Sequence, residues 1–341
     1  MVTGGGLAGD PLPSTWAAEG SLMRRSLARD FAALPGAAVV MTLDHRLPDE
    51  PGPWTVVRVG PGDEESVFLR LAAEADHTLA IAPETGRCLE TRAHWIRDAG
   101  GRSLGSEPAA IALAADKAAL AQVFVGRDIR TPPTRVYSRL VGPPRDFRYP
   151  AVLKPNDGAG CLSTFVVDSA DNLSTFDRYP HPSGLLQPLM PGVPMSASFL
   201  VSASGRGRLL AVGEQRMRLV DRAFQYEGGR ITGDVDRCDS HVRRALEVIP
   251  GLRGFVGVDF LWDETSGRAI VLEVNPRPTT SAHAIASLLG SGKLAAEWLR
   301  TIDDSADPSR LPALIRPTLP FEFSVSDHAE PDEGGPFDVG F

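Results

Sequence analysis

The chain has 341 residues, 43% hydrophobic and 23% charged, a composition typical of a globular protein with two or three structural units. Its formal net charge of −8 argues against nucleic-acid binding, which needs a basic face. No apolar run is long enough for a membrane span and no signal-peptide pattern is present. Cys88, Cys161 and Cys238 fit neither a disulfide framework nor a metal site, so we expect reduced thiols in a cytoplasmic protein.

The first hundred residues alternate between helical and strand-like patterns. Apolar positions recur at helical spacing over 21–34, and short apolar runs predict buried strands at 37–43, 54–59 and 77–82. This alternation predicts a small parallel α/β unit. The sequence GGGLAG at 4–9 also satisfies the GxGxxG pattern of dinucleotide sites. We assign no such site, because the pattern requires a preceding strand and none is predicted here.

The pattern changes after residue 106. A helix is predicted over 108–126, and beyond residue 149 strands and hairpins dominate, which indicates an α+β region. Strands are predicted at 151–155, 162–168, 184–190, 195–203, 208–219, 254–262 and 269–275, and helices near 171–177, 241–249 and 281–289. The last segment is acidic and rich in Gly and Pro, which predicts a disordered tail over 316–341.

Polar residues interrupt two otherwise apolar strands of this region. In the last predicted strand, alternation places Val271, Glu273 and Asn275 on one face and Leu272 on the opposite, core-facing side. A carboxylate and an amide oxygen two residues apart suit a hard cation such as Mg²⁺. Asp259 lies inside another apolar strand, where a buried charge needs a partner. Asp259, Glu273 and Asn275 are therefore candidate metal ligands; the alternative is an edge strand with solvated carboxylates.

Lysine is rare in this chain. Of 35 basic residues only Lys117, Lys154 and Lys293 are lysines. Lys154 ends an apolar strand and precedes a loop with Gly158 and Gly160, where backbone N–H groups can approach an anion closely. We therefore predict a phosphate contact, although the GxxxxGK[ST] pattern is absent. The alternatives are a plain glycine hairpin loop and, for Lys117, a solvated helix face.

Taken in order, these elements resemble the ATP-grasp superfamily over about residues 108–289. The resemblance implies that Lys117 and Lys154 bind phosphate, the latter before a glycine-rich lid loop. It implies that Gln187 to Leu189 form the hinge that reads adenine through main-chain groups. It also implies ATP and Mg²⁺ as ligands, with Mn²⁺ compatible, and Asp259, Glu273 and Asn275 as the metal ligands.

Two further features concern the same resemblance. Arg277 follows the predicted metal ligands and is a candidate for holding the γ-phosphate or an acyl intermediate, so that Arg277 and Lys154 are the predicted catalytic residues. Many family members carry a glutamate for the ribose hydroxyls shortly after the hinge glycine. Here Gly192 is followed by Val, Pro, Met and Ser, and the ribose contact stays unassigned.

Looser similarities point to one group within the superfamily. The segments 19–31, 81–84, 191–202, 213–217 and 224–229 resemble the tyramine–glutamate ligases of methanofuran biosynthesis. They make Gln215, Arg216 and Tyr226 candidate substrate contacts; the alternative is ordinary polar sheet residues. The arginine-rich composition is typical of a bacterium rather than a methanogen, which is compatible with a methylofuran-type pathway of one-carbon metabolism.

We therefore expect an ADP-forming carboxylate–amine ligase that joins glutamate to a tyramine-like amine through an acyl phosphate. The alternatives are a ligase for another amino acid, of dipeptide or D-amino-acid type, and a non-catalytic ATP-binding regulatory protein. The expected domains are a pre-ATP-grasp α/β domain (1–106), two ATP-grasp subdomains (107–182 and 183–315) and the tail (316–341). The expected partners are small-molecule carboxylate and amine substrates, without nucleic acid or membrane, and a homo-oligomer is compatible.

Overall fold

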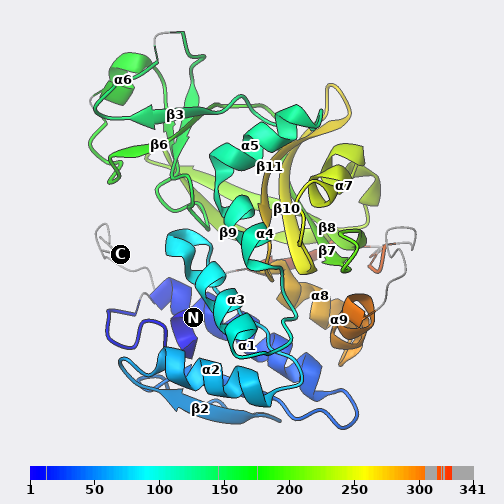
Figure 1. Ribbon diagram of the computed structural model, residues 1–341. Coiled ribbons are helices and arrows are strands. Elements are labelled where there is room, and N and C mark those ends of the chain that lie inside the picture. Colours follow the sequence, from blue (N-terminus) through cyan, green and yellow to red (C-terminus); the bar gives the residue numbers. More distant parts are fainter. Residues whose placement is uncertain are drawn as a thin grey trace.

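The computed structural model of the chain (Figure 1) describes residues 1–12, 14–144, 146–174, 176–303, 313–315, 317 and 319–324. An N-terminal part with α1, α2, α3 and β2 lies at the bottom of the view, and a smaller lobe with α6 and β3 lies at the top left. Of the predicted disordered tail, Phe321–Ser324 instead forms a strand, β12. Residues 325–341 lie outside the described residues.

The N-terminal part is the small α/β unit predicted from the sequence. Its strands β1 (Val40–Asp44) and β2 (Thr55–Val59) pair in parallel. Its helices are η1 (Val2–Gly4), α1 (Ser14–Ala32), α2 (Glu64–Glu74), η2 (Thr85–Arg87) and α3 (Cys88–Asp98). The strand expected at 77–82 is wrong, because this segment makes a single bridge, from Thr78 to Ser103. Its apolar side chains, Leu79 and Ile81, pack against a core instead of forming a ladder.

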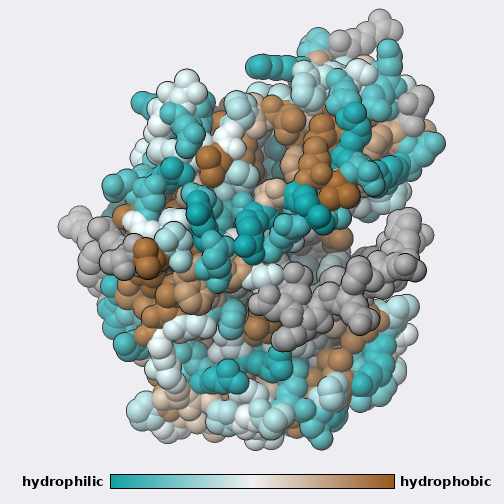
Figure 2. Space-filling model, turned by 180° about the vertical axis from the view of Figure 1, so that it is seen from behind, coloured by the Kyte–Doolittle hydropathy of each residue, from teal (hydrophilic) through white to brown (hydrophobic). Residues whose placement is uncertain are grey.

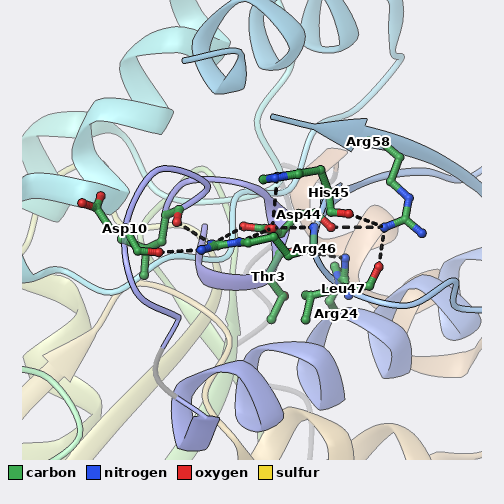
Figure 3. Close-up of polar contacts among 9 residues, drawn as sticks. Thr3, Asp10, Arg24, Asp44, His45, Arg46, Leu47 and Arg58 are labelled. Atoms are coloured by element: carbon green, nitrogen blue, oxygen red, sulfur yellow. Dashed lines mark hydrogen bonds and ion pairs between the residues drawn. The ribbon is translucent and has the colours of Figure 1, made fainter. Parts of the chain in front are cut away.

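A polar network holds the first ten residues against β1 (Figure 3). Asp44 is fully buried and accepts hydrogen bonds from the Arg46 backbone N–H (3.0 Å) and from Nε (2.9 Å) and Nη2 (2.8 Å) of its guanidinium. Arg46 also donates to the carbonyls of Leu7 and Asp10. Arg24 of α1 binds two further carbonyls, those of Thr3 and Thr42. The network thereby fixes the segment that leads into α1.

Two helices replace the single helix expected over 108–126. α4 (Pro108–Ala115) and α5 (Lys117–Gly126) meet at Asp116 with a bend of 92°. The Asp116 carboxylate accepts the N–H of Ala119 and the side-chain amide of Asn156, so it caps α5 instead of continuing α4. Lys117 therefore begins a helix and is buried, in contrast to the solvated helix position considered above.

No single helix in the described part of the chain is long and apolar enough to cross a membrane. Only α4 and α5 taken together reach the required length and apolar composition, and they are sharply bent.

A ten-stranded sheet in the order β11-β10-β7-β8-β9-β5-β4-β6-β3, with β12 on β9, forms the centre of the molecule. The strands are β3 (Arg135–Ser138), β4 (Ala151–Lys154), β5 (Phe165–Val167), β6 (Ser183–Pro188), β7 (Val193–Val201), β8 (Gly207–Val220), β9 (Ala223–Thr232), β10 (Gly254–Asp263) and β11 (Arg268–Asn275). β3, β9 and β12 were not expected from the sequence. The predicted α+β class with a parallel α/β N-terminal unit is confirmed.

The two halves of this sheet meet at one residue pair. β5 joins β9 only through Phe165 and Ala223, where two backbone hydrogen bonds of 2.8 and 2.9 Å link residues 164–166 to 222–224. β6 pairs with β4 and β3 in the smaller half, and β7, β8, β10 and β11 pair in the larger half. The domain boundaries proposed at 106, 182 and 315 remain predictions.

Helices cover both faces of the larger half. α7 (Ser240–Glu247) packs over a core that includes Phe199, Val256 and Phe260. On the other face, α8 (Ser281–Leu289) and α9 (Lys293–Asp303) pack with α1 around Trp298. Of the two remaining short helices, α6 (Ala170–Ser174) follows β5 and η3 (Val235–Arg237) follows β9. Seen from behind, apolar residues gather in the upper half of the surface between hydrophilic ones (Figure 2).

Candidate active site

A cavity of about 890 Å³ is lined by residues from both halves of the large sheet and from α1. The predicted site residues that line it are Lys117, Lys154, Gly158, Gly160, Gln187, Leu189, Gln215, Tyr226, Asp259, Glu273, Asn275 and Arg277. The structure therefore brings together every predicted site residue except Arg216.

The three predicted metal ligands lie on neighbouring strands. Asp259 of β10 is directly opposite Glu273 of β11, and Asn275 donates a hydrogen bond from Nδ2 to the Asp259 carboxylate at 3.0 Å. Gln215 of β8 donates to the other Asp259 oxygen at 3.1 Å. The pairing of β10 with β11 thus gathers two carboxylates and an amide at one point of the cavity wall.

A β-bulge overturns the alternation predicted for β11. Asp259 pairs with Glu273, whereas the next residue, Phe260, pairs with Val271, so Leu272 is the extra residue. Leu272 therefore lines the cavity and Val271 is buried in the core, the reverse of the expected arrangement. Beyond the bulge, Glu273 and Asn275 keep the cavity-facing side on which they were predicted.

The charges in this cluster are strongly coupled. Burial and the neighbouring Glu273 raise the pKa of Asp259 to about 7. Burial acts in the same direction on Glu273, but the charges of Lys117 and Lys154 outweigh it, so the pKa of Glu273 is lowered. The Lys117 ammonium lies 3.3 Å from the Glu273 carboxylate. Burial also lowers the pKa of Lys154 to about 8.

These residues fit Mg²⁺. Two adjacent half-buried carboxylates with an amide oxygen beside them are the ligand types that Mg²⁺ takes alongside substrate phosphates, and the raised pKa of Asp259 indicates a site that a cation would stabilise. In the described part of the chain, no group of three His, Cys, Asp or Glu side chains is placed to hold a metal ion by itself.

The two lysines approach the cluster from different elements. Lys154 ends β4 and Lys117 begins α5, and both are buried. The loop after Lys154 connects the antiparallel strands β4 and β5, so it is a hairpin loop that also lines the cavity. Lys117 Nζ donates to the carbonyl of Gly158 in this loop at 2.6 Å.

The first half of this loop is also bound to the N-terminal part. The Asp157 carboxylate accepts the N–H of Gly86 at 3.0 Å, and the Thr85 hydroxyl donates to the Asp157 carbonyl at 2.9 Å. Sequence analysis did not find this contact, because it joins residues 71 and 72 positions apart. The loop therefore bridges the N-terminal part and the small half of the sheet.

The predicted hinge lies at the end of β6. Gln187 pairs with Val152 in the sheet and donates from its side chain to the Thr134 hydroxyl at 2.9 Å. The Leu189 N–H donates to the Pro150 carbonyl at 2.8 Å, so this main-chain donor is already engaged. Both residues still line the cavity.

Arg277 is fixed by a residue that sequence analysis assigned no role. Its guanidinium binds both oxygens of Glu84, with Nε 2.9 Å from Oε1 and Nη2 3.0 Å from Oε2. Glu84 is only 5% exposed, and this ion pair outweighs the effect of burial and raises the pKa of Arg277. The sequence signals were that Glu84 follows Pro83 at the end of the apolar run at 79–82 and that it lies in segment 81–84, which resembles the tyramine–glutamate ligases.

The predicted substrate contacts separate into two groups. Gln215 and Tyr226 line the cavity, and burial raises the pKa of Tyr226 well above its usual range. Arg216 follows Gln215 in β8 and therefore points to the opposite face, where it pairs with Glu322 of β12 at 3.0 Å. The structure therefore does not bring Arg216 to the cavity with Gln215 and Tyr226, and its role as a substrate contact stays a prediction.

Three other lining residues were not singled out from the sequence. Trp16 and Glu19 come from α1, and Thr280 precedes α8. Glu19 is the first residue of segment 19–31, but nothing in its local pattern indicates that it faces a cavity formed by β9 and β11.

Comparison with known proteins identifies the domain families of this chain. Residues 114–281 match the ATP-grasp domain family, and residues 37–111 match the pre-ATP-grasp domain family. The chain belongs to the ATP-grasp superfamily. The tyramine–L-glutamate ligase of Methanocaldococcus fervens is 26% identical over 218 residues, which cover 62% of this chain and 61% of that protein. The match therefore spans about three fifths of that relative's length.

Solved structures agree on the ATP-grasp fold. A protein described as a putative ATP-grasp superfamily member from Archaeoglobus fulgidus matches with a TM-score of 0.64 and 22% identity, over 88% of this chain and 86% of that one. D-alanine–D-alanine ligase from Bacillus anthracis matches with a TM-score of 0.60 and 15% identity, over 85% and 94%. Its complex with ATP matches with a TM-score of 0.56 and 17% identity, over 83% and 92%.

Proposed function

We propose that this chain is an ADP-forming carboxylate–amine ligase. The observation that carries the proposal is the cluster of Lys117, Lys154, Asp259 and Glu273 at one wall of a cavity in an ATP-grasp fold. Two buried cations beside two half-buried carboxylates suit a polyphosphate with its divalent cation better than they suit a neutral ligand. The names of the tyramine–L-glutamate and D-alanine–D-alanine ligases, both of which join an amine to a carboxylate, support the reaction class.

The reaction proceeds in two steps that balance. The γ-phosphoryl group of ATP passes to a substrate carboxylate, which gives ADP and an acyl phosphate. The amine nitrogen then attacks the acyl carbon, the bond from that carbon to the phosphate oxygen breaks, and the amine proton leaves with phosphate. Positioning and charge neutralisation provide most of the catalysis of phosphoryl transfer.

Each cavity residue has a part in this scheme. Lys117 and Lys154 bind the phosphate oxygens, and Arg277, oriented by Glu84, holds the transferring phosphoryl group or the acyl intermediate. Asp259, Glu273 and Asn275 would hold Mg²⁺, which when bound neutralises phosphate charge. The loop at 155–164 excludes water from the acyl phosphate, which water would otherwise hydrolyse.

The finer proposal concerns the substrates. Glutamate as the acyl donor and a tyramine-like amine as the acceptor are favoured by the 26% identical relative of that name. Ligation of another amino acid is the alternative outcome. A place in a methanofuran-type pathway, a cytoplasmic location and a homo-oligomeric state remain predictions.

A phosphate-release screen tests the proposal. Purified protein with ATP and Mg²⁺ is mixed with each of the twenty L-amino acids, D-alanine and D-glutamate, alone and in pairs with tyramine, other arylamines or a second amino acid. We expect release that depends on both partners, with L-glutamate and tyramine giving the amide by mass spectrometry. Phosphate release with a different donor and acceptor would show that the proposed substrates are wrong and would identify the actual pair. ATP binding without release for any pair would favour the non-catalytic alternative.

A further inference from the structure

The cavity wall near Arg277 contains a carboxylate that the proposed function gives no role. Glu19 comes from the first turns of α1, outside the segments that match the two families. It lines the cavity together with Trp16, Arg277, Thr280 and Tyr226. Thr280 interacts through its side chain with both Glu19 and Tyr226, so these three residues form one cluster on the cavity wall.

The cation near Glu19 is already engaged elsewhere. Arg277 attracts Glu19, but its guanidinium binds both oxygens of Glu84. Glu19 forms no ion pair among the residues that the structure describes. Burial raises the pKa of Glu19, so the charged carboxylate lacks full compensation. A half-buried carboxylate that faces a substrate cavity without an ion-pair partner favours a cationic ligand.

We propose that Glu19 recognises the ammonium group of a substrate beside Arg277. The inference rests on the proposed ligase function. That function provides two sources of the group: the α-ammonium of an amino-acid donor that is activated at another carboxyl, and the ammonium of the acceptor amine. Glu19 is then a specificity-determining residue that selects cationic substrates by charge and by a hydrogen bond.

The position of Glu19 supports a role distinct from nucleotide binding. On the nucleotide side, Glu273 pairs with Lys117, lies opposite Asp259 and is attracted by Lys154. Glu19 instead interacts with Thr280 and Arg277 and belongs to the N-terminal part. Trp16, one helical turn before Glu19, lines the same wall and offers an apolar surface to the body of a substrate. α1 therefore contributes both an anionic and an aromatic group.

The test compares wild type with Glu19→Gln, which keeps the shape and removes the charge. Glu65→Gln is the matched control, because Glu65 lies on the exposed side of α2. Three quantities are measured with the pair found active in wild type: the Kd of Mg²⁺–ATP, the KM of the donor and the KM of the acceptor amine. We expect an unchanged Kd and a KM raised about 10- to 100-fold for one substrate, the effect of one charged hydrogen bond.

Two arms distinguish the source of the ammonium group. Glutarate is glutamate without its α-ammonium, so donor recognition predicts that wild type prefers glutamate over glutarate and that Glu19→Gln loses this preference. Acceptor recognition predicts an unchanged donor preference and a raised KM for tyramine. Glu19→Asp keeps the charge and should retain part of the selectivity. If Glu19→Gln does not fold, Glu19→Asp is used in its place in both comparisons.

The outcomes separate this inference from the proposed function. If wild type releases no phosphate with any pair of substrates, both the proposed ligase activity and the proposed role of Glu19 are wrong. If wild type is active and Glu19→Gln has the KM values and the glutamate preference of wild type, only the role of Glu19 falls. If Glu19→Gln weakens Mg²⁺–ATP binding as much as it weakens substrate binding, Glu19 acts on the fold of the cavity and the inference is wrong.

Discussion

Lys154 and Lys117 show how much depends on single residues here. Both ammonium groups are buried near the same carboxylate, Glu273, although one ends a strand and the other begins a helix. Arginine serves almost everywhere else in this chain, yet these buried positions carry the compact cation. A point charge with rotatable donors fits a crowded site that a planar guanidinium would not enter.

Replacing Lys154 by arginine tests this idea. We expect Lys154→Arg to bind ATP at least about 10-fold more weakly and to turn over slowly, because the longer fork cannot occupy the buried strand end although charge is retained. Calorimetric ATP titration and phosphate release measure the two effects. Lys293→Arg, at the start of α9, is the matched control. Wild-type kinetics in Lys154→Arg would remove this lysine from the mechanism.

Glu273 allows a sharper test of charge against shape. Glu273→Gln keeps the geometry of β11 and removes the carboxylate that faces Asp259 and Lys117. We expect turnover to fall by at least about 10²-fold, a few kcal/mol of lost electrostatic stabilisation. Single-turnover phosphate release at saturating ATP measures this effect. Near-normal turnover at limiting Mg²⁺ would contradict the assignment of Glu273 as a metal ligand.

Asp44 gives an acid-dependent stability prediction. The hydrogen bonds from Arg46 lower the pKa of Asp44 in the folded protein, so its stabilisation is present above the unfolded pKa of about 4 and is lost as pH falls through the folded value. Asp44→Asn should cost about 1–3 kcal/mol of unfolding free energy at pH 7. The difference from wild type should shrink towards pH 3. Urea unfolding at pH 7, 4 and 3 checks this, with exposed Asp98→Asn as control.

At the scale of elements, the two halves of the loop after β4 differ in how many hydrogen bonds attach them to the rest of the protein. Its first half is bound by Thr85, Gly86 and Lys117. In its second half, the N–H groups of Leu162 and Thr164 donate only to the carbonyls of Ala159 and Cys161. The external hydrogen bonds of this half are one between Ser163 and His181 at 3.3 Å and one from the Phe224 N–H to the Thr164 carbonyl, where the loop enters β5. An element with few external contacts opens locally at low free energy. We therefore expect the second half of the loop to open more readily than the first half when no nucleotide is bound.

Hydrogen exchange across the loop tests this division. Without nucleotide we expect fast exchange over 159–164 and slower exchange over 156–158, and with ATP we expect protection of both. Asp157→Ala removes the carboxylate that binds Gly86 and should speed exchange of the first half without changing α6. Asp76→Ala, at an exposed position, is the control. Equal exchange in both halves of the wild-type loop would contradict the uneven attachment.

Local pattern predicted much of the site but not its connections. Lys154 at a strand end and the Glu-x-Asn of β11 were predictable, because strand alternation is a local property. The bulge at Leu272 was not, since it depends on how β11 pairs with β10. The break between α4 and α5 likewise depends on Asn156, which lies 40 residues beyond Asp116. Gln215 and Arg216 are adjacent in a predicted strand, so alternation alone places them on opposite faces, but which of the two faces the cavity depends on how β8 pairs with β7 and β9.

At the scale of the whole molecule, the N-terminal part completes the cavity. Glu84 fixes Arg277 from 193 residues away, Asp30 of α1 caps α9 by accepting the N–H groups of Gly292 and Ala295 (2.7 and 2.6 Å), and α1 contributes Trp16 and Glu19. No periodicity predicts such pairs, because they form only once the separate parts have folded. The site is therefore a property of the assembled chain.

Glu84→Gln tests this dependence. Removing one partner leaves the buried Arg277 uncompensated, so we expect a loss of about 3–5 kcal/mol in stability and a lower kcat. Glu90→Gln is the control, because its partner Arg87 is 76% exposed and the pair should contribute at most about 1 kcal/mol. Thermal unfolding and steady-state kinetics measure both variants. Equal losses of stability in Glu84→Gln and Glu90→Gln would show that the ion pair of Glu84 contributes no more than an exposed one.

The single pair that joins β5 to β9 has a mechanical consequence. A sheet whose two halves are paired through a single residue pair resists twisting weakly at that point, because few hydrogen bonds oppose the rotation. Twisting the small half against the large one strains two backbone hydrogen bonds, about 1 kcal/mol net each, a hydrogen bond from Arg178 to the Asp221 carbonyl and a surface ion pair between Arg222 and Asp168. The hydrogen bonds of Thr85 and Gly86 to Asp157 hold the small half from the other side. These few bonds resist bending far less than the long β7–β8 and β8–β9 ladders do. The lobe that carries Lys154 can therefore change its angle while the carboxylates of β10 and β11 keep theirs.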